Sequence, residues 1–172
     1  MDYELRKQPF RPLIPDVAWI EFNNEAELQK ITHRTAGVVL ETIQGGAGFI
    51  TPENDYLAKV KKRCEEVGAL LILDEIQPGF GRTGTLFGFQ NYNVVPDIIA
   101  IGKGMASGLP CGAFVASYEL MHLLADKPKM SHITTFGGNP VVAAASLATL
   151  RELLSTDLMA QTLEKEQLFR KL

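Results

Sequence analysis

The sequence has few of the residues that define disulfide-rich or nucleic-acid-binding proteins. Only 2 of its 172 residues are cysteine, and Cys64 and Cys111 form no Cys-x-x-Cys pair. This argues against a disulfide scaffold and is typical of reduced thiols in a cytoplasmic protein. No dense cluster of lysine and arginine occurs and the net charge is −3, so we expect no nucleic-acid partner.

Long apolar runs and metal-ligand patterns are also lacking. The longest run of small apolar residues, 140–150, ends at Arg151 and is too short to cross a bilayer, so no membrane partner is expected. The histidines show none of the spacings typical of metal ligands. We therefore predict no metal site and assign structural or loop positions to His33, His122 and His132.

Apolar strands alternate with helices along the chain. Buried strands are predicted for 36–42, 69–73 and 97–101, a fourth strand for 112–116, and a short strand for 17–22. This alternation predicts a single α/β domain with a mostly parallel sheet and flanking helices, and the apolar fraction of 46% suffices for a packed core.

The helices are predicted from residues that cap or start them. Asn24 is a candidate N-cap, Thr51 and Pro52 open a helix that extends to about residue 67, and Asn139 caps a long helix that ends near residue 154. In a parallel sheet, ligands bind beyond the carboxyl ends of the strands. The residues at those ends are 41–44, 74–77 and 102–104.

Asp74 directly follows the apolar run 70–73. A carboxylate at the end of a buried strand is costly to desolvate unless a positive group meets it. Asp74 alone favours a helix cap or a structural ion pair, and the alternative is a fixed negative charge that faces a cationic ligand atom.

Lys103 ends the third predicted strand between Gly102 and Gly104. Glycines let a bulky ligand approach the backbone, and a partly desolvated lysine becomes a nucleophilic amine. A Walker A phosphate loop is excluded because glycine, and not serine or threonine, follows the lysine. Taken alone, Lys103 favours a solvated lysine in a turn.

Together, an aspartate and a lysine at the ends of separate strands match the needs of pyridoxal 5′-phosphate (PLP). The carboxylate of Asp74 would keep the pyridine nitrogen protonated, and Lys103 would form the Schiff base and move protons. Two other segments could hold a phosphate: the glycines of 45–48, where a plain turn is favoured, and residues 134–140, for which a helix entry is an equal alternative.

Three motifs resemble the class III aminotransferases, which are PLP enzymes of fold type I. They are Leu-Ile-Leu-Asp-Glu-Ile-Gln-Pro-Gly-Phe-Gly-Arg-Thr-Gly at 71–84, Pro-Asp-Ile-Ile-Ala-Ile-Gly-Lys-Gly at 96–104, and Thr-Phe-Gly-Gly-Asn-Pro at 135–140. The order and spacing match, and the resemblance extends from about residue 10 to 154. Acetylornithine, ornithine and 4-aminobutyrate aminotransferases are members of this family.

The resemblance implies a role for each matching residue. Lys103 would be the Schiff-base lysine, Asp74 would pair with the pyridinium nitrogen, and Gln77 would lie near the phenolic oxygen of the cofactor. Thr135 would reach the phosphate of PLP bound mainly to the other subunit, which implies a homodimer. Glu41 matches a glutamate near the active site.

The chain departs from the family pattern at one position and in its extent. Gly46 replaces a glutamate that gates a substrate-binding arginine in several members, which argues against typical ornithine or 4-aminobutyrate specificity. Residues 1–172 match the central and C-terminal part of the large PLP-binding domain, without the N-terminal segment and the C-terminal small domain. We therefore expect a fragment that is inactive on its own.

The expected activity is transfer of an amino group between an amino donor and a 2-oxo acid. Two alternatives stay open. The same fold and residues also serve aminomutases, racemases and decarboxylases, because the cofactor supplies the chemistry. The chain could instead be an inactive remnant or an interaction piece.

Overall fold

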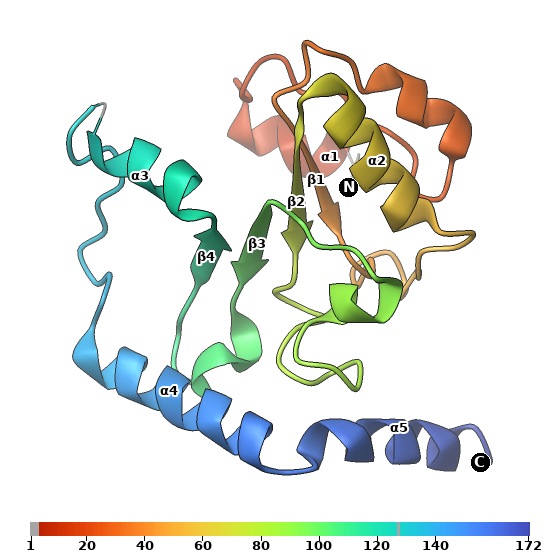
Figure 1. Ribbon diagram of the computed structural model, residues 1–172, viewed down its shortest axis with the longest axis vertical. Helices are drawn as coiled ribbons and strands as arrows, with labels where there is room; N and C mark the ends of the chain where they lie inside the picture. Colours follow the sequence, from red (N-terminus) through yellow and green to blue (C-terminus); the bar gives the residue numbers. More distant parts are fainter. Residues whose placement is uncertain (1–3, 127) are drawn as a thin grey trace.

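The centre of the molecule is a four-stranded, mostly parallel sheet, as the alternation of strands and helices predicts. The computed structural model describes residues 4–126 and 128–172. The strand order is β1-β2-β3-β4, in which β1, β2 and β3 are parallel and β4 is antiparallel to β3 (Figure 1). The segment that joins β3 to β4 is too short for a crossover, so β4 turns back beside β3. The strands are β1 (Gly37–Glu41), β2 (Leu70–Asp74), β3 (Ile98–Ile101) and β4 (Ala113–Ala116).

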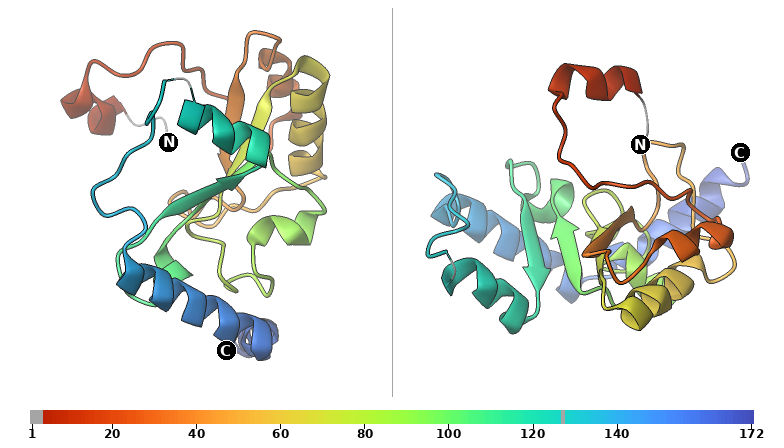
Figure 2. Two further views of the ribbon diagram at one scale, coloured as in Figure 1. Left: turned by 60° about the vertical axis from the view of Figure 1, so that its left-hand side comes forward. Right: turned by 90° about the horizontal axis from the view of Figure 1, so that it is seen from above.

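The helices lie around this sheet in two groups. α2 covers one face of β1 and β2, while α4 lies across the end of the sheet at which β3 ends and packs on the 3-10 helix Lys103–Ala106 (Figures 1 and 2). The α-helices are α1 (Glu4–Lys7), α2 (Tyr56–Val67), α3 (Tyr118–Asp126), α4 (Pro140–Ser155) and α5 (Leu158–Phe169). Further 3-10 helices span Gln8–Phe10, Glu25–Lys30 and Gly88–Tyr92. None of the helices in the described part of the chain is both long and apolar enough to cross a membrane.

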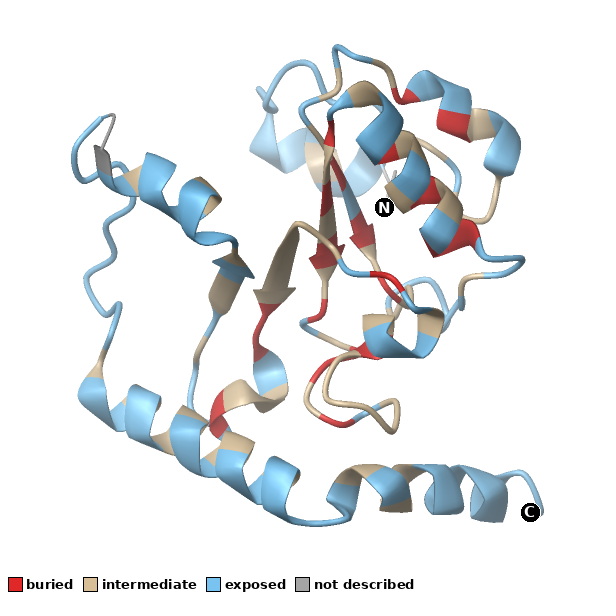
Figure 3. Cartoon of the chain, viewed as in Figure 1, coloured by how far each residue is buried: buried red, intermediate tan, exposed pale blue. Residues whose placement is uncertain are grey.

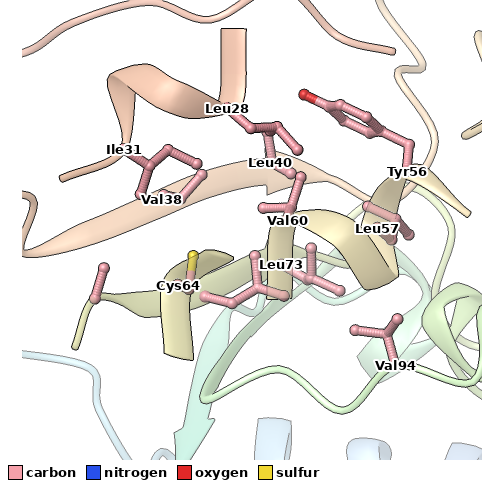
Figure 4. Packing of buried hydrophobic residues seen from close by; sticks show 12 residues of the cluster. Leu28, Ile31, Val38, Leu40, Tyr56, Leu57, Val60, Cys64, Leu73 and Val94 are labelled. Carbon is pink, nitrogen blue, oxygen red and sulfur yellow. The ribbon is translucent and has the colours of Figure 1, made fainter. Parts of the chain in front are cut away.

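The hydrophobic core lies between α2, the 3-10 helix Glu25–Lys30 and one face of β1 and β2. Side chains alternate between the two faces of a strand, and the core takes every second residue of β1 and β2 (Figure 4). The residues of the other face, called the open face below, are half-buried, and Val39 among them is exposed (Figure 3). The main core residues are Leu28, Val38, Leu40, Leu57, Val60, Cys64, Leu71 and Leu73.

Val38 and Val39 offer a matched pair of substitutions on the two faces of β1. Val38 is 7% exposed in the core, whereas Val39 is 67% exposed on the open face. We expect Val38→Ala to lower the free energy of unfolding of the chain by about 2 kcal/mol, since it removes buried methyl groups and leaves a cavity. Val39→Ala should change it by less than about 0.5 kcal/mol. Urea denaturation measures both, and equal losses would contradict this assignment of faces.

Local sequence signals predicted some helix boundaries correctly and others wrongly. The caps at Asn24 and Asn139 are confirmed, since each side-chain oxygen accepts a backbone N–H at the start of its helix. The start at Thr51 is wrong, because α2 begins only at Tyr56. The two residues before Tyr56 have positive φ angles, which no helix continues through. The strand predicted for 17–22 is also wrong, since this segment is irregular and Phe22 packs edge-on against Tyr56.

An ion pair ties α2 to the beginning of β3. The Lys61 Nζ lies 2.8 Å from Asp97 Oδ1, and Asp97 Oδ2 accepts the backbone N–H of Leu71 at 2.7 Å. Burial acts to raise the pKa of Asp97, but the hydrogen bonds and the charge of Lys61 outweigh it and hold this pKa below its usual value. The carboxylate form therefore stabilises the fold above the pKa that Asp97 has in the unfolded chain, and this stabilisation is lost as the pH falls through the lowered pKa.

We therefore expect the effect of Asp97→Asn to depend on pH. At pH 7 the variant should lose about 1–3 kcal/mol of unfolding free energy, which is what hydrogen bonds to a charged group contribute. The difference from the unsubstituted chain should begin to shrink below about pH 3.9, the ordinary pKa of an aspartate, because the unfolded chain then takes up a proton before folded Asp97 does. Urea denaturation at pH 7, 5 and 3 measures this, and a pH-independent difference would refute the linkage.

Candidate functional site

The candidate site lies at the edge of the sheet where β1, β2 and β3 end. The last residues of β1 and β2, Glu41 and Asp74, are register partners. Because Leu40 and Leu73 point to the core, alternation places Glu41 and Asp74 on the opposite, open face. Lys103 follows β3 at the same edge (Figure 1). The three strand ends that the sequence indicates as ligand-binding positions therefore lie at one edge of the sheet.

Lys103 has a strained backbone and an exposed side chain. Its φ angle is +44°, a left-handed conformation that costs a non-glycine residue about 1–3 kcal/mol and tends to occur at functional sites. The Nζ donates a hydrogen bond to Oε1 of Gln77. Lys103 forms no ion pair with a carboxylate among the described residues. The partner of the amine is therefore a neutral amide and not a carboxylate.

The glycines beside Lys103 serve the packing of the protein itself. A Cβ at Gly104 would lie 3.2 Å from Cβ of Phe80, and a Cβ at Gly102 would lie 3.3 Å from the carbonyl oxygen of Cys111. The space beside each glycine is thus filled by the chain. These glycines therefore let neighbouring loops approach closely, and the admission of a ligand to the backbone stays a prediction.

Gln77 joins the loop after β1 to Lys103. Glu41 Oε2 accepts the backbone N–H of Gly45 at 2.9 Å. A Cβ on Gly45 would lie 3.1 Å from Cγ of Gln77, so the lack of a side chain there lets Gln77 lie against the loop. Glu41 and Gln77 therefore both lie against Gly45, and Lys103 joins them through its hydrogen bond to Gln77.

Asp74 keeps one carboxylate oxygen available. Its Oδ1 accepts the backbone N–H of Ile76 at 2.9 Å. Within residues 4–126 and 128–172, no hydrogen bond or ion pair engages Oδ2. The structure thus shows neither the helix cap nor the ion pair that a lone aspartate favours, and the half-buried carboxylate can receive a cationic ligand atom.

Thr135 is not brought to the other four residues. It lies in the loop between α3 and α4, in which residues 128–138 are all exposed. No hydrogen bond joins it to Glu41, Asp74, Gln77 or Lys103 in the part of the chain that the structure describes. Its role at a phosphate stays a prediction. Two of the histidines make ring contacts nearby, His132 with Phe114 and His122 with Tyr118.

Sequence reasoning missed Glu75, which is fully buried beside the site. Its Oε1 accepts the Thr42 hydroxyl and the Phe89 N–H, the latter at 2.9 Å, and Oε2 accepts the Gly88 N–H at 2.7 Å. Burial raises the pKa of Glu75, and the three hydrogen bonds oppose that rise. Strand alternation could have signalled this residue, because it places Glu75 on the core face, where a glutamate needs partners.

Comparison with known proteins points to one family. The family model for class-III aminotransferases matches residues 9–172. An acetylornithine aminotransferase of Oceanobacillus iheyensis is 43% identical over 167 residues, which are 96% of this chain and 41% of that protein.

Solved structures give the same result. The ornithine aminotransferase of Toxoplasma gondii superposes with a TM-score of 0.79 at 32% identity, over 85% of this chain and 35% of that one. The N-acetylornithine aminotransferase of Stenotrophomonas maltophilia gives 0.77 at 35% identity, over 90% and 39%. The predicted α/β architecture of fold type I is thereby confirmed, and the chain spans less than half the length of these relatives.

Proposed function

Because the chain belongs to the class-III aminotransferase family, we propose that it carries the cofactor-binding edge of a PLP-dependent aminotransferase in the cytoplasm. The whole protein would transfer an amino group between an amino donor and a 2-oxo acid. The observation that supports the proposal is that Lys103, Gln77 and Asp74 lie at one sheet edge, where the amine meets a neutral amide and Asp74 Oδ2 has no partner among the described residues.

The residues of this edge fit PLP. Lys103, held by the Gln77 amide, would link to the cofactor aldehyde as a Schiff base and then hold or pass the proton that moves during transfer. The free Oδ2 of Asp74 would hold the proton on the pyridine nitrogen. The bound cofactor supplies an electron sink for the carbon that loses its proton.

Gln77, Glu41 and Thr135 complete the proposal. The amide of Gln77 would lie beside the phenolic oxygen, and Glu41 would keep the loop at Gly45 in place through its backbone hydrogen bond. Thr135 would serve the phosphate bound mainly to a second subunit of a homodimer. Thr135 lies in an exposed loop and makes no hydrogen bond to Lys103 among the described residues, which is consistent with that role.

The test uses the protein with its flanking coding sequence. Amino transfer would be measured with N-acetylornithine and with ornithine as donors, and with a panel of 2-oxo acids as acceptors. These two donors are chosen because the names of the relatives contain them. We expect transfer that depends on the 2-oxo acid. Racemisation or decarboxylation of the amino acid with no transfer to any acceptor would reject the proposal.

A further inference from the structure

Glu75 is a buried glutamate to which the proposed chemistry gives no task. It has no exposed surface, and its carboxylate accepts three hydrogen bonds from the Thr42 hydroxyl and the N–H groups of Gly88 and Phe89. Burial of a charge without partners is strongly unfavourable, and here three donors meet it. The fold therefore supplies hydrogen-bond donors that stabilise this buried carboxylate at the edge of the sheet.

The three donors come from two separate loops. Thr42 directly follows Glu41 at the end of β1, whereas Gly88 and Phe89 open the 3-10 helix Gly88–Tyr92. The backbone adds a third connection, because the Glu75 N–H donates to the carbonyl oxygen of Ala100 in β3 at 2.8 Å. One residue thus ties together the ends of β1, β2 and β3.

We propose that Glu75 is a positioning residue, whose buried carboxylate clamps the loops at 41–46 and 84–92 to the end of β2 and so fixes Asp74 and Gln77. The consequence for the cofactor rests on the proposed function, but the clamp itself does not. Asp74 and Gln77 flank Glu75 in the sequence, so any displacement of its backbone moves both.

The chemistry of the clamp requires a carboxylate of this length. All three partners donate, so the group must accept only, as an ionised carboxylate does. In Glu75→Gln, the amide would turn an N–H group toward at least one partner, and the hydrogen bonds that remain would lose the negative charge of their acceptor, so the contacts with both loops weaken. The approach of Gly88 also depends on its missing side chain, since a Cβ there would lie 2.9 Å from Cβ of Pro78.

A simpler role for Glu75 would be a cap for the 3-10 helix Gly88–Tyr92 alone. Acceptors at the first N–H groups of a helix are common. The Thr42 hydrogen bond separates the two roles, because a cap predicts no effect on the loop after β1. Thr42 is itself fully buried, so bulk water cannot replace Glu75 as the hydrogen-bond partner of its hydroxyl.

Amide hydrogen exchange of the complete, cofactor-free protein tests the clamp directly. In Glu75→Gln we expect exchange to rise about tenfold in both 41–46 and 84–92, as loss of hydrogen bonds to a charged group allows. Exchange in α2 should stay unchanged. Thr42→Val, which keeps the shape of the side chain, should raise exchange in 41–46 only. Glu53→Gln, at an exposed position, is the control.

Three exchange results would overturn the proposal. They are a rise confined to 84–92 in Glu75→Gln, an equal rise in α2, and unchanged exchange at 41–46 in Thr42→Val. The measurement on Thr42→Val tests the clamp even if Glu75→Gln does not fold.

The dissociation constant of PLP tests the consequence for the site. We expect it to rise about tenfold in Glu75→Gln, and less in Thr42→Val, where one of the three hydrogen bonds is lost. An unchanged constant together with faster exchange in both loops would overturn the positioning role. Absence of PLP binding by the unsubstituted protein would instead reject the proposed function, and the exchange measurements would still decide whether Glu75 is a clamp.

Discussion

Lys103→Ala is expected to lower the rate of amino transfer by the complete protein by at least about 10⁴-fold, the upper end of what general acid–base catalysis alone contributes. Lys103 is proposed both to link to the cofactor and to move the proton, so no neighbouring group replaces it. The second readout is chemical. Borohydride reduction of the PLP-loaded protein, followed by peptide mass analysis, should find the cofactor mass fixed on Lys103.

Lys62→Ala is the matched control for this substitution. Lys62 is an exposed lysine of α2, on the far side of β1 and β2 from the open face. Its loss should leave both the rate and the labelled peptide unchanged. A cofactor mass on any other lysine of the unsubstituted protein, or wild-type turnover by Lys103→Ala, would contradict the assignment.

The sequence predicts the fold well where a strand is continuously apolar. The apolar runs that contain Leu71 and Leu73, and Val38 and Leu40, indicate strands that each place two side chains in the core, and parallel neighbours then bring their carboxyl ends to one edge. This is why Asp74 and Lys103 could be placed at one site before the structure was known. The start of α2 could not be placed, because positive φ angles at Asn54 and Asp55 override the local signals of Thr51 and Pro52.

Contacts between distant residues set the limit of the prediction. The partners of Glu75 lie 33 residues before it and 13 and 14 after it, and no local pattern links them. The same holds for Gly104, whose neighbour Phe80 belongs to another loop. Thr135 differs from Glu75, since no hydrogen bond among the described residues indicates what it does.

Asp74→Asn is expected to lower kcat by about 10²–10³-fold, the loss typical of removing one preorganised electrostatic contact from a site. The substitution keeps the shape of the side chain, and its oxygen can still accept the Ile76 N–H. What it removes is the negative charge that would hold the pyridine nitrogen protonated. The cofactor should still attach to Lys103, so the same variant should retain the reducible lysine linkage that Lys103→Ala loses.

Asp55→Asn is the matched control for the charge of Asp74. Asp55 is exposed, and its side chain makes no capping hydrogen bond at the start of α2. Asparagine also tolerates the positive φ angle found there. This variant changes the net charge by the same amount as Asp74→Asn, so its kcat should equal that of the unsubstituted protein. If both variants lost activity equally, the loss would come from the overall charge. If Asp74→Asn kept its full kcat, Asp74 would not be the partner of the ring nitrogen, and its free oxygen would have another task.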